Sequence, residues 1–170
     1  GPPLSAETSF PYAPFVEPGD EHIMVPDWLN DLTLYHNRGD STWAGESVTF
    51  GDFYGLDDLM TEHPDVVDGF IDIYSTWMDF GIDGFRIDTM KHVNFEFWED
   101  WATKIANNPN AIKRDFFMFG EVYSADQKIT SEYVRKTDVS SILDFAFQAQ
   151  AMSYATGASA RSLSSLYEND

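Results

Sequence analysis

The alternation of helical and strand-like patterns after Pro64 constrains the fold of this 170-residue chain more than any other feature. Apolar residues recur at helical spacing in DVVDGFIDIYSTWMDFG, which follows Pro64 and ends at Gly81, and this pattern predicts an amphipathic helix. Short apolar runs then alternate with further helical patterns. The expected elements are a strand at 83–88, a helix at 94–106, a strand at 116–122, a helix at 126–136, a strand at 140–147, and helical structure from 149 onward that is broken near Gly157.

This rhythm predicts an α/β fold in which helices cover parallel strands. A doubly wound sheet and a (β/α)8 barrel both fit the order of elements. The sequence has no GxGxxG or GxxxxGK[ST] stretch, which weakens the nucleotide-binding version of the doubly wound sheet. A complete barrel needs about 250 residues and eight strands. If the fold is a barrel, the chain is a partial (β/α)8 TIM barrel with about three of the eight strands.

Residues 1–60 differ from the rest of the chain, because they are rich in Pro, Gly, Asp, Asn and aromatic residues and show little periodicity. A loop region of this length is uncommon in compact domains and tends to be functional. The aromatic residues of this region could stack against sugars or could form a small core of its own. They are Trp28, Tyr35, Trp43, Phe53 and Tyr54.

The charge of the chain excludes several classes of partner. The formal net charge is −19, and residues 1–80 hold sixteen Asp and Glu against one basic residue, Arg38. Such a surface repels phosphate backbones and anionic lipids, so we expect neither a nucleic acid nor a membrane as partner. It suits a neutral substrate, a cation such as calcium, or simple solubility. The absence of cysteine excludes disulfides and cysteine nucleophiles, and no apolar run approaches the roughly 18 residues of a membrane span.

Charged residues stand at the ends of two predicted strands. Side chains alternate along a strand, so Arg86 and Asp88 of DGFRID share one face, while Phe85 and Ile87 point to the other face and pack under the helices. The next strand, FFMFG, is followed directly by Glu121. In a barrel of parallel strands these C-terminal ends carry the active site.

Asp88 and Glu121 would then lie about as far apart as the two carboxylates of a retaining glycosidase. Neighbouring strands are about 4.7–4.9 Å apart, and that enzyme class separates nucleophile and acid by roughly 5–5.5 Å. Arg86 would keep Asp88 ionised, and Glu121 would be the proton donor. The spacing alone leaves an alternative open, in which Arg86 and Asp88 form a buried ion pair and Glu121 is a solvated loop residue.

Three stretches resemble motifs of the α-amylase family of glycoside hydrolases (family 13), in the order and spacing of that family. GFRIDTMKHV resembles the nucleophile motif, FGEV resembles the general-acid motif, and GLDDLMTEHP at 55–64 resembles the motif that closes the inserted domain after the third barrel strand. The resemblance covers essentially the whole chain. It implies part of the loop-rich inserted domain at 1–60 and the central part of the (β/α)8 catalytic barrel at 61–170.

The resemblance also implies a role for each matching residue. Asp88 resembles the nucleophile that forms the glycosyl-enzyme intermediate, and Glu121 resembles the general acid and base. Arg86 resembles the residue that keeps the nucleophile ionised and oriented. Lys91 and His92 resemble the pair that binds glucose units on the leaving side.

A structural calcium ion is implied as well, with ligands from the Asp58 carboxylate and the carbonyl of His92. Oxygen ligands suit calcium, although Asp58 in a turn could also be a cap or turn residue. The motif departs from the family at Asp57, where proline is frequent. Two family motifs have no match in the chain. They are the D-x-x-x-N-H pattern, expected upstream of residue 1, and the N-H-D stretch with the third catalytic Asp, expected downstream of residue 170.

These features predict a retaining glycosidase that acts on α-1,4-glucans such as starch, glycogen and maltodextrins. The alternatives are transglycosylation, a sucrose- or trehalose-acting relative, and a non-catalytic carbohydrate-binding fragment. We expect the chain to belong to a longer enzyme and to be inactive alone, with its sheet edges covered by that enzyme or by a second copy. No leader peptide is visible, but Gly1-Pro2 could be a protease-cleavage scar, in which case the natural N-terminus would be missing. The resemblance favours a secreted or periplasmic location.

Overall fold

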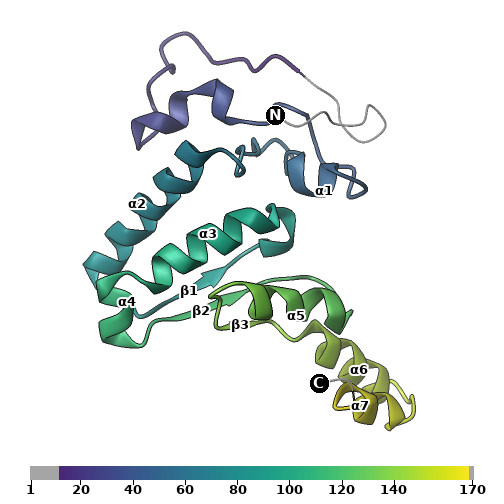
Figure 1. Cartoon of the computed structure of the whole chain (residues 1–170). Helices are drawn as coiled ribbons and strands as arrows, with labels where there is room; N and C mark the ends of the chain where they lie inside the picture. Colours follow the sequence, from purple (N-terminus) through teal and green to yellow (C-terminus); the bar gives the residue numbers. More distant parts are fainter. Residues whose placement is uncertain (1–11, 169–170) are drawn as a thin grey trace.

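The structure, a computed structural model, describes residues 12–168 of the chain. Its centre is a parallel sheet with the strand order β1-β2-β3, and a helical crossover joins each strand to the next (Figure 1). The strands are β1 (Gly84–Ile87), β2 (Phe117–Gly120) and β3 (Ser141–Ile142). The α-helices are α1 (Ser47–Phe50), α2 (Pro64–Phe80), α3 (Phe95–Ala106), α4 (Pro109–Arg114), α5 (Gln127–Lys136), α6 (Phe145–Ala155) and α7 (Arg161–Leu166), and the short 3-10 helices are η1 (Asp27–Asn30), η2 (Leu32–Leu34) and η3 (Met90–His92).

The predicted alternation of helices and parallel strands is therefore confirmed, with two differences. The third strand was predicted at 140–147 but ends at Ile142, because Asp144 caps a helix. The Asp144 side chain accepts a hydrogen bond of 2.8 Å from the Phe147 amide, so the apolar residues after it begin α6. The second difference is α4, which was not predicted. Its signals are the Asn108 cap and Pro109 at the first turn.

Helix α2 has clear signals at both ends. The His63 side chain accepts a hydrogen bond from the Asp65 amide, and Pro64 occupies the first turn, where a missing N–H costs nothing. The helix ends at Gly81, which has φ 111°, a left-handed conformation that glycine adopts without strain.

One face of the sheet carries the core. Phe85 of β1 packs edge-on against Tyr74 of α2, with the ring centroids 4.9 Å apart, and also contacts Trp101 of α3. Ile87 and Met118 belong to the same buried cluster. Because neighbouring residues of a strand point to opposite faces, Arg86 lies on the face away from α2 and α3. This arrangement agrees with the alternation predicted from DGFRID.

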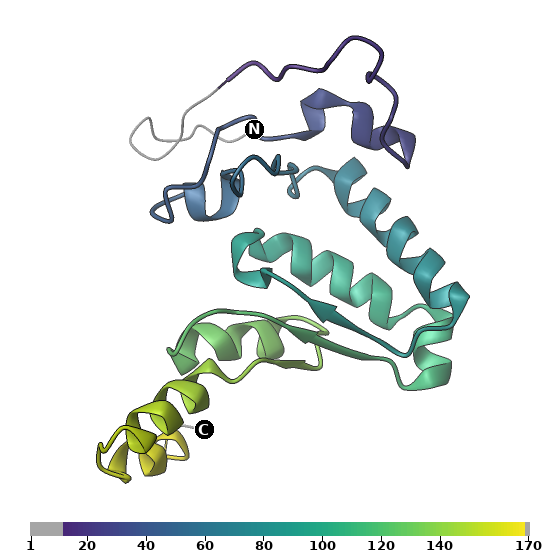
Figure 2. The same cartoon turned by 180° about the vertical axis from the view of Figure 1, so that it is seen from behind.

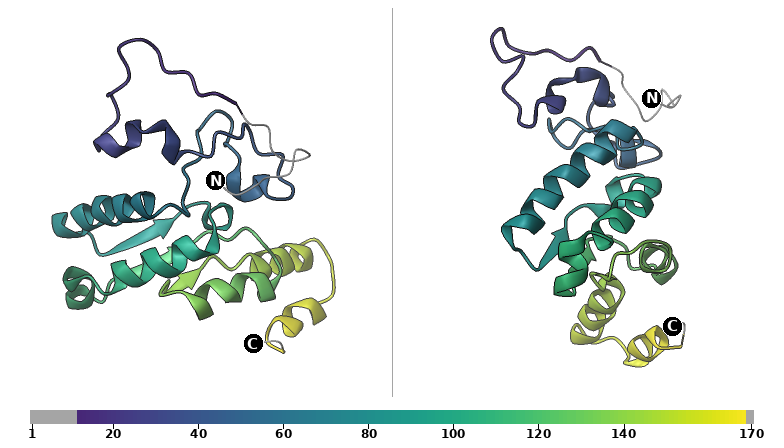
Figure 3. Two further views of the ribbon diagram at one scale, coloured as in Figure 1. Left: turned by 45° about the horizontal axis from the view of Figure 1, so that its top comes forward. Right: turned by 60° about the vertical axis from the view of Figure 1, so that its left-hand side comes forward.

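Residues 12–63 pack around the N-terminal end of α2, whereas α6 and α7 lie at the opposite end of the molecule (Figure 2, Figure 3). The first of these segments has little regular structure, as predicted. Trp28 fixes it to α2 by packing against Gly69, where an added Cβ would come within 2.4 Å of the indole. The segment also returns on itself, since the His36 amide donates to the Asp58 carbonyl at 2.9 Å. Within residues 12–168 no helix has the length and apolar character that crossing a membrane requires.

Candidate functional site

Arg86 links the two carboxylates at the C-terminal ends of β1 and β2. Its Nη1 lies 3.4 Å from Oδ2 of Asp88, and its Nη2 lies 2.5 Å from Oε2 of Glu121. The sheet brings the three residues together, because the parallel register pairs Ile87 with Gly120 and therefore sets the next residues of both strands side by side. The Glu121 amide continues the ladder by donating to the Ile87 carbonyl at 2.8 Å.

None of these three charged side chains is fully buried. The side chains of Arg86, Asp88 and Glu121 are 49%, 66% and 26% exposed. Arg86 and Asp88 do form an ion pair, but in this chain it is not the buried pair of the alternative that the spacing left open. The pair lies on the face of the sheet that α2 and α3 do not cover.

The turn after Asp88 is held by buried contacts. Thr89 has φ 50°, an uncommon conformation for a β-branched residue that costs of order 1–3 kcal/mol and needs support from its surroundings. Met90 supplies that support, since its side chain is fully buried and its carbonyl accepts from the Trp98 indole at 2.9 Å. Gly120 makes room for it, because a Cβ there would lie 2.2 Å from the Met90 sulfur.

Lys91 and His92, predicted to bind the leaving side of the substrate, follow this turn but have different partners. The Lys91 ammonium donates to the Tyr123 carbonyl at 3.1 Å, just after Glu121. The His92 ring Nδ1 lies 3.0 Å from the Val48 carbonyl of α1. The structure thus places Lys91 beside the C-terminal end of β2 and His92 beside the loop-rich segment.

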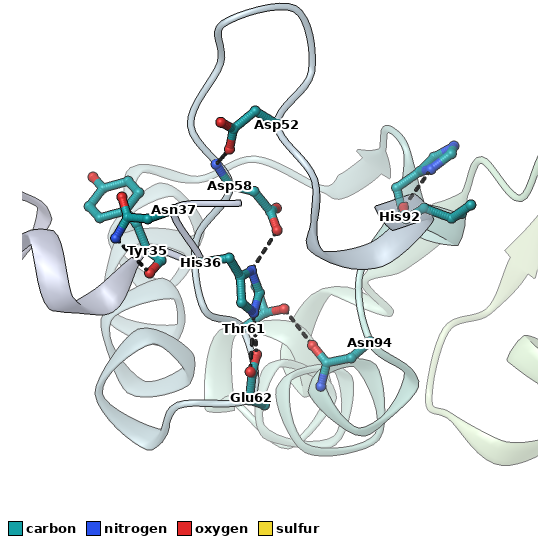
Figure 4. A network of polar contacts seen from close by, with 10 residues as sticks. Tyr35, His36, Asn37, Asp52, Asp58, Thr61, Glu62, His92 and Asn94 are labelled. Atoms are coloured by element: carbon teal, nitrogen blue, oxygen red, sulfur yellow. Dashed lines mark hydrogen bonds and ion pairs between the residues drawn. The ribbon is translucent and has the colours of Figure 1, made fainter. Parts of the chain in front are cut away.

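A second polar cluster surrounds His36, a residue without a predicted role. The His36 side chain is 1% exposed and lies between two carboxylates, with Nδ1 2.6 Å from Asp58 and Nε2 2.9 Å from Glu62 (Figure 4). Asp52, also buried, accepts from the Asp58 amide at 2.9 Å. Asp58 and Glu62 lie 22 and 26 residues after His36 in the sequence. No periodic pattern predicts contacts between residues so far apart.

The ionisation of this cluster follows from its burial and its pairing. Burial by itself lowers the pKa of His36, but the hydrogen bonds and charges of Asp58 and Glu62 outweigh that effect and raise the pKa to about 9. Burial raises the pKa of Asp58 to about 6, against the opposing influence of His36. Burial by itself raises the pKa of Glu62, but the hydrogen bond and charge of His36, together with a backbone hydrogen bond, outweigh that effect and lower the pKa. At neutral pH the cluster is an imidazolium between two carboxylates.

The residues predicted to hold calcium do not form a metal site by themselves. Calcium takes about six to eight oxygen ligands, but one carboxylate oxygen of Asp58 is engaged by His36. Within residues 12–168 no group of three or more His, Cys, Asp or Glu side chains could hold a metal ion. The described side chains alone therefore supply too few ligands for the ion, and calcium stays a prediction from the resemblance.

Aromatic side chains of the loop-rich segment gather beside His92. The rings of Phe53 and Trp43 lie edge-on to the imidazole, with centroids 4.9 Å and 5.6 Å away. Tyr54 contacts Trp43 and is 82% exposed. Trp28, by contrast, packs on α2. Trp28 therefore fits the interpretation of a core residue, while sugar stacking by the rings near His92 stays a prediction.

Comparison with known proteins finds one family repeatedly. A family model described as "Alpha amylase, catalytic domain" matches residues 12–168. The alpha-amylase of Streptomyces lividans is 56% identical over 165 residues, which cover 95% of this chain and 18% of that protein. A cyclomaltodextrin glucanotransferase of Klebsiella oxytoca is 32% identical over 123 residues, which cover 67% of this chain and 19% of that protein. The crystal structure of an Anoxybacillus alpha-amylase superposes with a TM-score of 0.62 at 32% identity, covering 74% of this chain and 28% of that one. The chain spans less than a fifth of the length of these two curated relatives.

Proposed function

Because this chain belongs to the α-amylase catalytic-domain family, we propose that the enzyme carrying it is a retaining glycosidase that hydrolyses α-1,4-glucans. The observation that supports this proposal most strongly is the pair of carboxylates, Asp88 and Glu121, which Arg86 bridges at the ends of adjacent parallel strands. In the proposed architecture, 61–170 form the central part of a (β/α)8 barrel and 1–60 belong to an inserted domain.

The proposed reaction has two displacements at the anomeric carbon. In the first, a carboxylate oxygen of Asp88 attacks this carbon while Glu121 gives its proton to the glycosidic oxygen, and the leaving glucan departs. In the second, Glu121 takes a proton from water, the water oxygen attacks the same carbon, and the bond to Asp88 breaks. Two inversions give net retention of the anomeric configuration.

Arg86 is proposed to keep Asp88 ionised and oriented for the first displacement. A guanidinium remains charged at every working pH and presents a planar set of donors that suits carboxylates. Both carboxylates contact it, so substrate entry has to compete with the Arg86–Glu121 contact before Glu121 can reach a glycosidic oxygen. Lys91 and His92 are proposed to bind glucose units on the leaving side.

Calcium and the third catalytic carboxylate both remain part of the proposal through the family resemblance alone. Asp58 and the His92 carbonyl would contribute oxygen ligands only together with donors outside residues 12–168. No step of the reaction above depends on the ion. The third Asp of the family has no match in the sequence.

The test is product analysis with the complete enzyme and maltoheptaose. We expect linear maltooligosaccharides whose new reducing ends appear first as the α-anomer in proton NMR. Asp88→Asn should abolish turnover, and Glu121→Gln should reduce kcat by about 100- to 10,000-fold. Asp83→Asn is the matched control, because Asp83 is an exposed carboxylate at the other end of β1 and should leave the rate unchanged.

The second candidate reaction is transglycosylation, which the similarity to a cyclomaltodextrin glucanotransferase favours. The same assay separates the two, since cyclic or lengthened products would indicate transfer to a sugar hydroxyl instead of water. A wild-type rate in Asp88→Asn would show that neither mechanism uses this residue as its nucleophile.

A further inference from the structure

The imidazole of His92 is held by residues of the loop-rich segment and not by its own neighbours. Its Nδ1 lies 3.0 Å from the Val48 carbonyl. The rings of Phe53 and Trp43 flank it at interplanar angles of 78° and 86°. All three contacts come from 43–53, whereas His92 ends the turn that begins at the candidate nucleophile.

The contact with Val48 fixes the tautomer of the ring. A carbonyl oxygen can only accept a hydrogen bond, so Nδ1 of His92 must carry the proton. In the neutral ring Nε2 is then the acceptor. Among the residues that the structure describes, Nε2 has no hydrogen-bond partner, so it is available to a ligand.

The position of the Val48 carbonyl depends in turn on Ser47. The Ser47 side chain is buried, and its hydroxyl donates to the Ala44 carbonyl at 2.8 Å while accepting from the Thr42 amide at 3.1 Å. These bonds close the loop that leads into α1. At the other end of α1, Gly51 packs so closely that an added Cβ would lie 2.7 Å from the Ser41 Cα. We call residues 41–53 the α1 platform.

We propose that the α1 platform positions His92, so that Nε2 accepts a hydrogen bond from a hydroxyl group of a glucose unit on the leaving side, and that Ser47 is a positioning residue for this contact. This inference rests on the proposed function, in which Lys91 and His92 bind the leaving side. Lys91 takes its orientation from the Tyr123 carbonyl on the sheet side. Each half of the chain therefore orients one member of the pair.

The physical consequence is a division between binding and chemistry. The platform contacts His92 but contributes no residue to the Arg86 bridge between Asp88 and Glu121. Loosening it should therefore weaken the hold on the leaving-side sugar and raise KM, while the steps at the anomeric carbon and kcat keep their rates.

A double-mutant cycle on the complete enzyme tests this, with maltoheptaose as the substrate. We expect Ser47→Ala to raise KM by about 3- to 10-fold, the value of one hydrogen bond, with kcat within about twofold of wild type. His92→Ala should raise KM at least as much. The double variant should match His92→Ala, because the platform acts through that ring. Ser131→Ala, which removes a hydroxyl bonded within α5, is the control and should behave as wild type.

Two results would overturn the inference. One is an unchanged KM in Ser47→Ala, and the other is a double variant whose loss is the product of the two single losses. If Ser47→Ala does not fold, His92→Asn replaces it, because the Asn amide can still donate to Val48 but has no group at the Nε2 position. We expect His92→Asn to unfold at the same midpoint as wild type but to show the raised KM of His92→Ala. A wild-type KM in His92→Asn would refute the role of Nε2. A wild-type enzyme that does not hydrolyse maltoheptaose would instead disprove the proposed function.

Discussion

Replacement of His36 by glutamine should destabilise the native protein in a way that depends strongly on pH. The imidazolium lies between Asp58 and Glu62 with its side chain 1% exposed, so removing it leaves two carboxylates near one another without their cation. Uncompensated buried charge is one of the few causes of large losses of stability. Glutamine keeps a side chain of similar reach but carries no charge.

The magnitude and the sign follow from the pKa of His36. A rise from 6.5 to about 9 corresponds to an upper bound of about 3 kcal/mol in favour of the folded state. Because the folded-state pKa is the higher one, this contribution is complete below about pH 6.5 and is lost as the pH rises through about 9. The raised pKa of Asp58 gives the same sign at lower pH, since stability falls as the pH rises from about 4 to 6 and the buried carboxyl ionises.

The assay is urea unfolding of the complete enzyme at pH 6.5, 8 and 10 in EDTA, so that no bound divalent cation contributes. We expect the difference between wild type and His36→Gln to be largest at pH 6.5 and to shrink toward pH 10. His22→Gln, at a histidine whose side chain is 85% exposed, is the matched control and should show no difference. A constant difference from pH 6.5 to 10 would refute the reasoning, as would a His36 pKa near 6.5 in an NMR titration.

Three further predictions concern the strand ends and a helix cap. Gly120→Ala should cost about 1–3 kcal/mol in the free energy of unfolding, because the added Cβ meets the fully buried Met90 side chain; an unchanged urea midpoint would show that Met90 can move aside. Asp144→Ala should cost about 1 kcal/mol by removing the cap of α6, which is measurable as a lower unfolding midpoint, and Asp144→Asn should retain most of it. Arg86→Lys should lower kcat on maltoheptaose by about 10- to 100-fold, since a point charge cannot contact Asp88 and the second carboxylate in the same geometry; a rate within twofold of wild type would contradict the bridging role.

The sequence predicted most of the sheet and its helices because their signals are local. The helix expected at 94–106 is α3, and the segment ending at Gly81 is α2. The error at 140–147 shows the limit of apolar runs as a signal. Such a run is compatible with a strand and with a buried helix, and only the hydrogen bond of Asp144 decides between them.

The sequence by itself determined which residues stand at the strand ends, because the alternation of side chains and the motif spacing are properties of the chain. Only the tertiary structure decided which distant residues meet. It brought His36 between Asp58 and Glu62, and it set the carbonyl of Val48 against His92. These contacts join residues 22 to 44 positions apart through irregular loops. No local periodicity describes such loops, since packing and burial alone fix where they return.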